Sequence, residues 1–555
     1  MVVWVPVVVV LLVGLTAMYT AATRGVGSDS DTASLVLEGQ SVLQGHVALH
    51  GWALSLDSFW TSEVPFYAIA DLLAGVRPLL LYLVPAFLYA SVVVVCAALA
   101  AAAASNRSGA VAGVVAVTAL LAFPTWAMSL VVLRGGHHLG AVLYSLVAFW
   151  CLRRGRWGWS AALAGVLLAA GMLGDLMTVA YGTAPLLVAG VAAMLRGGSV
   201  RDGRVQVGVA LGAAAGALVV REAAKAVGTF GIAAANPLAG GQQIVHNLRH
   251  LYSLGGELVG WKHTVFGTAG APPALYDLRM VGAAFVVACS ALALLRLLAG
   301  VVAGGPVDTA RSVGRQGAGR QGAGGGSRRG AEAPWWQSEP GGWRIDDALV
   351  VACFGAAATY VILAFANIPN LDRYLAPTAL FMSLLTSRVI ARAWSRLAAT
   401  GWGVLPAVGV VAVGITVAYG AAFGYQLTTT QYPQPAPALA SWLRAHHLTE
   451  GVGAYWAASL TTVEADGHVR VRPVIPDSHG HLVRYMRESA QEWYAGRSFD
   501  FLVFQPGPLA LGVTPGEAAA TWGPPAHQYA VDGYLVLVWA RPFAVPATRG
   551  VGAGP

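Results

Sequence analysis

Long apolar runs separated by short polar turns dominate the first 425 residues of the chain. Each run approaches the roughly 20 residues that a helix needs to cross the hydrocarbon core of a bilayer. The first run lacks the basic start of a secretory signal peptide, so we interpret it as an uncleaved span. The pattern predicts an α-helical polytopic membrane protein with about eleven transmembrane helices: 2–22, 79–104, 109–132, 138–152, 158–174, 178–195, 205–221, 279–303, 346–366, 374–394 and 403–424.

The pattern changes after residue 425, where apolar and polar residues begin to alternate. The stretches "HVRVRPV" and "YLVLVWA" have a period of two, which is typical of half-buried strands. We therefore divide the chain into a polytopic part, 1–425, and a small α/β domain, 426–545. The predicted helices of this domain are 437–446, 481–495 and 515–521, and its predicted strands are 453–457, 468–475, 499–504, 527–530 and 534–539.

Composition supports the membrane class and suggests an orientation. Charged residues make up only 11% of the chain, whereas soluble domains carry about a quarter. If the N-terminus is cytoplasmic, five arginine-bearing loops face the cytoplasm, as the positive-inside rule requires. The loops 23–78 and 222–278 and the domain 426–545 then lie outside the plasma membrane. The Gly- and Arg-rich loop 304–345 lies inside and is predicted to be disordered.

Several function classes are disfavoured by the sequence. The net charge of +8 comes mainly from arginines in membrane-flanking loops, so it does not indicate a nucleic-acid partner. The chain has no P-loop, dinucleotide-binding glycine pattern, GxSxG or HExxH. We therefore expect no nucleotide cofactor. The span interiors are nearly free of charge, which argues against an ion-coupled transporter. Abundant Ala, Gly, Val and Arg favour a GC-rich bacterial source.

Two acids, Asp29 and Asp31, follow directly on the first span and precede a predicted helix, 32–44. One of them can cap this helix, because a capping Asp accepts backbone N–H bonds. A cap does not need two acids, so the other is a candidate general base at the membrane–water boundary. His46 and His50 are spaced as metal ligands on a helix would be, but Gly45 and Gly51 disfavour a continuous helix there.

The rest of the first outer loop interleaves acids with aromatic residues. Asp57 and Glu63 stand among Phe59, Trp60 and Phe66. We expect a helix lying on the membrane surface, with its aromatic residues at the interface and its acids in water.

Four further candidates lie at two outer turns. Arg134, His137 and His138 belong to "LRGGHHLG" and suit a phosphate or another anionic group, although a polar helix terminus also explains them. Asp175 lies between two apolar runs, where either a binding role or a tight hairpin turn explains an acid.

The later outer loops add four more candidates for substrate binding. Arg249 shares a helical face with two histidines, and Lys262 follows in the same loop. Arg373 and Tyr374 stand where the tenth predicted span begins, and a snorkelling arginine is the alternative there.

The stretches "SDSDTASLVLEG", "HGWALSLDSFWTSEVPFY", "RGGHHLGA" and "DRYLAP" give the chain a resemblance to a known superfamily. The layout resembles the GT-C membrane glycosyltransferases, which include protein O-mannosyltransferases and aminoarabinose transferases. The C-terminal domain is similar to that of actinobacterial relatives. No Asp-Glu pair and no Trp-Trp-Asp stretch of the better-known members is present.

This resemblance implies a lipid-linked donor, a polyprenyl phosphate sugar, whose sugar moves at the outer face to a glycan, lipid or protein acceptor of the cell envelope. Asp29 or Asp31 would be the base, and Arg373, with Arg134, would hold the donor phosphate. Some members use a divalent metal and many do not; no residue here is assigned to one. The alternatives are a non-catalytic membrane scaffold and a lipid or glycan transporter.

Overall fold

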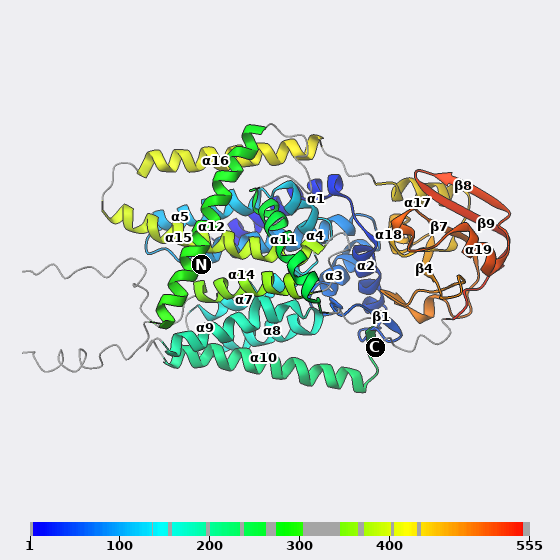
Figure 1. Ribbon diagram of the computed structural model, residues 1–555, viewed down its shortest axis with the longest axis horizontal. Helices are drawn as coiled ribbons and strands as arrows, with labels where there is room; N and C mark the ends of the chain where they lie inside the picture. Colours follow the sequence, from blue (N-terminus) through cyan, green and yellow to red (C-terminus); the bar gives the residue numbers. More distant parts are fainter. Residues whose placement is uncertain are drawn as a thin grey trace, which may run out of the picture.

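The computed structural model describes residues 4–135, 137–153, 158–195, 200–232, 238–261, 273–302, 345–363, 371–400, 405–429 and 434–547. Lys262 and almost all of the predicted loop 304–345 lie outside these residues. Figure 1 shows a long helical part with a sheet domain, coloured orange to red, at one end.

The helical part confirms the predicted class, because a helix coincides with each of the eleven apolar runs. Helix α7 packs on α8, α8 on α10, α10 on α9 and α9 on α14, and α10 and α14 run roughly along the long axis of the molecule (Figure 1). The helices are α1 (Trp4–Val26), α4 (Leu80–Ala101), α5 (Arg107–Val117), α6 (Trp126–Val132), α7 (Leu139–Leu152), α8 (Trp159–Gly174), α9 (Ala184–Leu195), α10 (Val200–Ala226), α12 (Pro273–Val302), α14 (Ile345–Ile362), α15 (Ala376–Ala399) and α16 (Leu405–Thr429).

Five of the described helices are long and apolar enough to cross a membrane, and six if one bent pair counts as a span. The bent pair replaces the predicted single helix 109–132: α5 continues as a π-helix, Thr118–Ala122, and α6 leaves it at 82°. Pro124 lies at this break, where its missing N–H and fixed φ prevent a continuous helix. The number of eleven spans stays a prediction.

Helices α2 (Ser30–Leu43) and α3 (Val64–Ala74) lie between the rest of the helical part and the sheet domain (Figure 1). The segments predicted to face outward also include α11 (Gly241–Val259) and the 3-10 turn η3 (Leu371–Tyr374). A small sheet joins three distant segments: β1 (Trp52–Leu54) pairs in parallel with β2 (Gly231–Ile232) and antiparallel with β6 (Ser489–Ala490). The first outer loop is thus hydrogen-bonded to the C-terminal domain.

The C-terminal domain has a six-stranded sheet in the order β5-β4-β3-β7-β9-β8. Side chains alternate between its faces, so Phe501 and Val503 pack with helices α17 and α18 while Leu502 and Phe504 pack on the side of α19. Its elements are α17 (Ala436–Ala445), β3 (Glu450–Ala454), α18 (Tyr455–Glu464), β4 (Arg470–Pro476), β5 (Leu482–Arg484), β7 (Phe499–Phe504), α19 (Pro515–Trp522), β8 (His527–Val531) and β9 (Tyr534–Phe543).

Two predictions for this domain are wrong. The segment 481–495 is not a helix, because β5 pairs with β4 and β6 pairs with β1 of the outer loop. The predicted strand 453–457 ends at Ala454, where α18 begins. Both errors arise from pairing and packing with distant residues, which override local preference.

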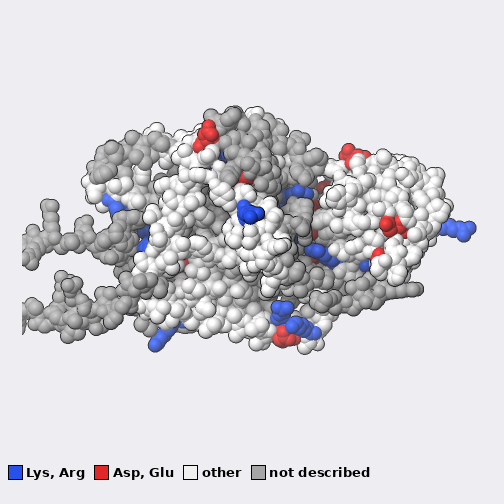
Figure 2. Space-filling model, in the orientation of Figure 1, with Lys and Arg blue, Asp and Glu red and all other residues white. Residues whose placement is uncertain are grey.

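Figure 2 shows few charged side chains on the visible face of the helical part, as expected for a surface in contact with lipid. Polar contacts instead join the helical part to the C-terminal domain. Tyr82 at the start of α4 donates to Glu464 of α18 at 3.2 Å, and Ser34 of α2 contacts Ser459 at 3.1 Å. Burial raises the pKa of the Glu464 carboxyl to about 7, against the opposing effect of the Tyr82 hydrogen bond.

We expect the stability of this junction to fall as the pH rises from about 4.5 to about 7. The folded protein prefers protonated Glu464, so its contribution is complete below the ordinary carboxyl pKa and is lost between about pH 4.5 and 7, by at most about 3 kcal/mol. The apparent Tm in detergent should therefore drop by about 2–3 °C from pH 5 to pH 8, and Glu464→Gln should remove this drop. Glu492→Gln, the same substitution at an exposed acid of the same domain, is the matched control; an unchanged slope in Glu464→Gln would contradict the assignment.

Candidate functional site

Asp29 and Asp31 have different local roles at the start of α2. Asp29 is the N-cap: its Oδ1 accepts from the backbone N of Thr32 at 3.0 Å and from its hydroxyl at 2.8 Å. The capping alternative therefore holds for Asp29. Asp31 lies in the first turn of α2, and its carboxylate binds side chains from later parts of the chain.

Asp31 joins three segments that are far apart in the sequence. Arg373 of η3 donates to its Oδ2 at 3.0 Å, and the Tyr455 hydroxyl at the start of α18 donates to its Oδ1 at 2.5 Å. Burial alone would raise the pKa of Asp31, but the Arg373 guanidinium, together with the Tyr455 hydrogen bond, holds this pKa below its ordinary value. The carboxylate is therefore ionised at neutral pH.

A second cationic segment approaches Asp29. Arg134 Nε lies 3.9 Å from its Oδ2, and His137 Nε2 lies 4.0 Å from its Oδ1. Between them, Gly135 has a φ of +137°, and an added Cβ would come within 2.6 Å of the Thr32 hydroxyl. Only glycine allows this close approach. Burial, followed by the Arg373 charge, lowers the pKa of His137 to about 4, so its ring is neutral at pH 7.

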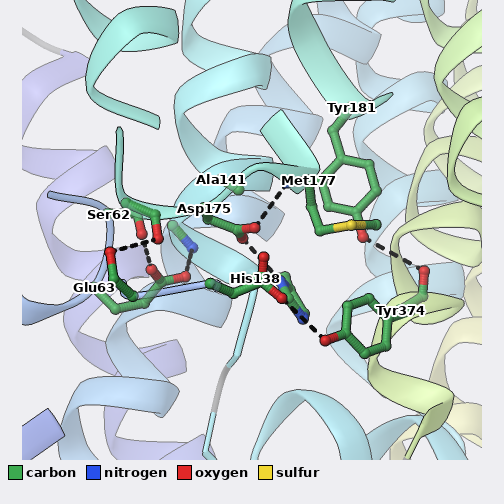
Figure 3. A network of polar contacts seen from close by, with 12 residues as sticks. Ser62, Glu63, His138, Ala141, Asp175, Met177, Tyr181 and Tyr374 are labelled. Carbon is green, nitrogen blue, oxygen red and sulfur yellow. Dashed lines mark hydrogen bonds and ion pairs between the residues drawn. The ribbon is translucent and has the colours of Figure 1, made fainter. Parts of the chain in front are cut away.

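Figure 3 shows a second polar group around His138, Asp175 and Tyr374, and Tyr374 directly follows Arg373 in the chain. His138 Nδ1 is 2.8 Å from Asp175 Oδ2, and the Tyr374 hydroxyl donates to Asp57 at 3.0 Å. Asp175 also accepts from the backbone N of Met177 at 2.9 Å, so it both closes a turn and contacts His138. Asp57, His138 and Asp175 are buried, and their possible ligand atoms lie within 4.8 Å of one another, so this group could hold a metal ion.

The acids of the first outer loop are not in water, contrary to expectation. Glu63 is fully buried and accepts from the backbone N of Gly140 at 2.9 Å and from the Ser62 hydroxyl (Figure 3). Burial and then the charge of Asp175 raise the pKa of both Glu63 and Asp57. Sequence reasoning missed both residues as site members, since their only signal was a loop rich in acids and aromatic residues.

The C-terminal domain adds a third group of residues that the sequence did not identify. Glu488 accepts from the backbone N of Ser55 at 2.8 Å and interacts with Glu38, a fully buried acid of α2. Burial, and then Glu488, raises the pKa of Glu38. Arg487 is close enough to Asp31 to lower the pKa of that carboxyl. The side of α2 that bears Asp31 is therefore covered by the C-terminal domain.

Arg249, His46 and His50 lie away from the acids at the start of α2. Arg249 is exposed on α11 together with His246 and His250, while Asn247 is the buried residue that binds carbonyls of α14. The structure does not bring Arg249 to the acids, because the opposite face of its helix packs on the bundle. His46 and His50 are exposed in turns after α2, and His50 contacts the Val227 carbonyl, so these two histidines do not form a ligand pair.

Two hollows in the described part of the structure are lined by helices of the polytopic part. One of about 30 Å³ lies at the α5–α6 break and is lined in part by Thr125, Met128, Arg279 and Tyr419. A smaller one, of about 10 Å³, is lined in part by Val26 at the end of α1. Neither is lined by Asp29 or Asp31, whose side chains are 10% and 16% exposed.

No family model matches the chain, and no curated protein matches it. Among solved structures, the chain is similar to ArnT from Cupriavidus metallidurans bound to undecaprenyl phosphate, at 11% identity over 95% of this chain and 97% of that one, with a TM-score of 0.47. It is also similar to the Archaeoglobus fulgidus oligosaccharyltransferase tethered with an acceptor peptide, at 13% identity over 89% and 68% of the chains, with a TM-score of 0.43.

Proposed function

We propose that this chain is a membrane glycosyltransferase that moves a sugar from a polyprenyl-phosphate-linked donor to a hydroxyl of a cell-envelope acceptor at the outer face. The observation that carries the proposal is the Asp31–Arg373 pair at 3.0 Å. A carboxylate from loop 23–78 and a guanidinium from the segment before α15 meet here, and such a pair can take a proton from an acceptor hydroxyl and bind a donor phosphate.

In this reaction the acceptor oxygen attacks the anomeric carbon, the bond from that carbon to the phosphate oxygen breaks, and the polyprenyl phosphate leaves with the electron pair. We assign Asp31 as the base that takes the acceptor proton, since its low pKa keeps it ionised. Arg373 would hold the phosphate: its Nε is buried and has no hydrogen-bond partner among the described residues. Asp29 keeps α2 in position and faces Arg134.

The orientation that we propose has the N-terminus in the cytoplasm and the C-terminal domain outside. Its support is a basic group, Arg388 and Arg392, which binds Asp346 at 2.6 and 2.5 Å. Arg392 lies 16 residues beyond the start of α15 at Ala376, which is about 24 Å along the helix. The basic group is therefore distant from Arg373, as expected for the cytoplasmic side.

Deletion of the gene in its own host tests the proposed function. We expect one polyprenyl phosphate monosaccharide to accumulate and one envelope glycan to disappear, because transfer stops after the donor is made. Mass spectrometry of extracted lipids and of hydrolysed envelope measures both changes. Restoration by wild type but not by Asp31→Asn supports an enzyme. If the protein is a scaffold, both wild type and Asp31→Asn should restore the glycan. Unchanged levels of lipid-linked sugars in the deletion strain would overturn the proposal.

A further inference from the structure

We propose that Asp57, His138 and Asp175 bind one Zn²⁺ ion that fastens three outer segments together. This proposal concerns metal binding and does not depend on the proposed transfer reaction. The three residues come from the loop before α3, the start of α7 and the end of α8. Their exposed fractions are 7%, 1% and 0%, so bulk water does not solvate them.

The geometry of the group is close to that of a zinc site. Zn²⁺ binds imidazole nitrogen and carboxylate oxygen at about 2.0–2.2 Å, so two ligands of one tetrahedral ion are about 3.3–3.6 Å apart. The three possible ligand atoms lie within 4.8 Å of one another. The most distant pair would have to approach by at most roughly 1.5 Å for all three atoms to reach one ion.

His138 is held in a costly arrangement that a bound ion would stabilise. Its Nδ1 lies 2.8 Å from Asp175 Oδ2, so Nδ1 is the ring nitrogen that can share an ion with this carboxylate. The residue has a φ of +65°, which is uncommon for a non-glycine residue and costs about 1–3 kcal/mol. A metal bonded to Nδ1 would hold both the ring and this backbone in place.

The donor set selects the ion. One imidazole and two carboxylates suit Zn²⁺, whereas Mg²⁺ and Ca²⁺ favour oxygen ligands alone. The expected role is positional, because the Tyr374 hydroxyl donates to Asp57 and Tyr374 directly follows Arg373. The ion would thus fix, through Asp57 and Tyr374, the segment that carries Arg373, the partner of Asp31.

The test uses full-length protein purified in detergent. We expect elemental analysis to find about one Zn²⁺ per chain, and Zn²⁺ added after dialysis against a chelator to raise the Tm. His138→Ala and Asp175→Asn should each lower the bound zinc at least tenfold. Asp57→Asn keeps the side-chain volume and an acceptor for Tyr374, so it tests ligation in a chain expected to fold. His137→Gln changes an equally buried neighbouring histidine and should retain the ion.

The proposal is overturned if wild type holds less than a tenth of an equivalent of zinc and Zn²⁺ does not shift its Tm. It is equally overturned if Asp57→Asn retains zinc at the wild-type level, or if Mg²⁺ or Mn²⁺ stabilises the protein while Zn²⁺ does not. Sugar transfer is not a readout in this experiment, so its result is separate from the fate of the proposed function.

Discussion

Asp31→Asn should lower the rate of sugar transfer by about 10²–10⁴-fold, the usual contribution of a general base. Asparagine has nearly the same shape as aspartate, but it cannot take a proton and cannot form the ion pair with Arg373. The measurement is the initial rate at which label passes from a polyprenyl phosphate sugar to envelope material, in membranes that contain equal amounts of each variant.

The matched control is Asp29→Asn, two residues away on the same helix. Asparagine caps helices as well as aspartate does, so α2 should keep its start, and we expect a loss of less than about tenfold from the weakened Arg134 contact. An equal loss in the two variants would move the base assignment from Asp31 to the pair of acids. Activity within threefold of wild type in Asp31→Asn would exclude Asp31 as the base.

Arg373→Ala should lower transfer by about 100-fold, because charge-assisted hydrogen bonds to a phosphate are worth about 1.5–3 kcal/mol each. Arg373→Lys keeps the charge but loses the planar pair of donors, so we expect an intermediate loss of about tenfold. Both losses should appear mainly as weaker use of the donor, which a titration of polyprenyl phosphate sugar at fixed acceptor measures.

Arg249→Ala is the control for this experiment, since Arg249 is an outer arginine that is exposed on α11. It should leave donor use unchanged. Removing Arg373 also leaves Asp31 without its cation, so Tm must be recorded for each variant. If Arg373→Ala lowers the Tm but its rate depends on donor concentration as in wild type, Arg373 stabilises the fold and does not hold the phosphate.

The sequence predicted the helical class because a segment that crosses a bilayer must be apolar over about 20 residues and must form its backbone hydrogen bonds internally, as a helix does. Both requirements can be recognised from a single stretch of sequence. The cap at Asp29 was likewise predictable from its place before an apolar helical pattern. The break at Pro124 was not anticipated, although the proline was visible in the run 109–132. Helix α18 was missed because "YWAASLTTVE" has no helix-starting signal of its own; it forms where Ala457 and Ala458 pack on the sheet.

The site was only partly predictable for a similar reason. Asp31, Arg373, His138 and Asp175 each carried a local signal, namely a charge at the end of an apolar run. Tyr455 carried none, and Asp57 only that of a loop rich in acids and aromatic residues, because their importance comes from partners hundreds of residues away. Sequence position alone does not indicate which acid of an outer loop will be buried.

The sheet formed by β2, β1 and β6 has a consequence for biosynthesis. Its central strand, β1, is made early, but its partner β6 leaves the ribosome only after nearly the whole chain has been translated. At about 5–20 residues per second this wait lasts tens of seconds. During that time the edge of β1 that pairs with β6 remains without its partner strand.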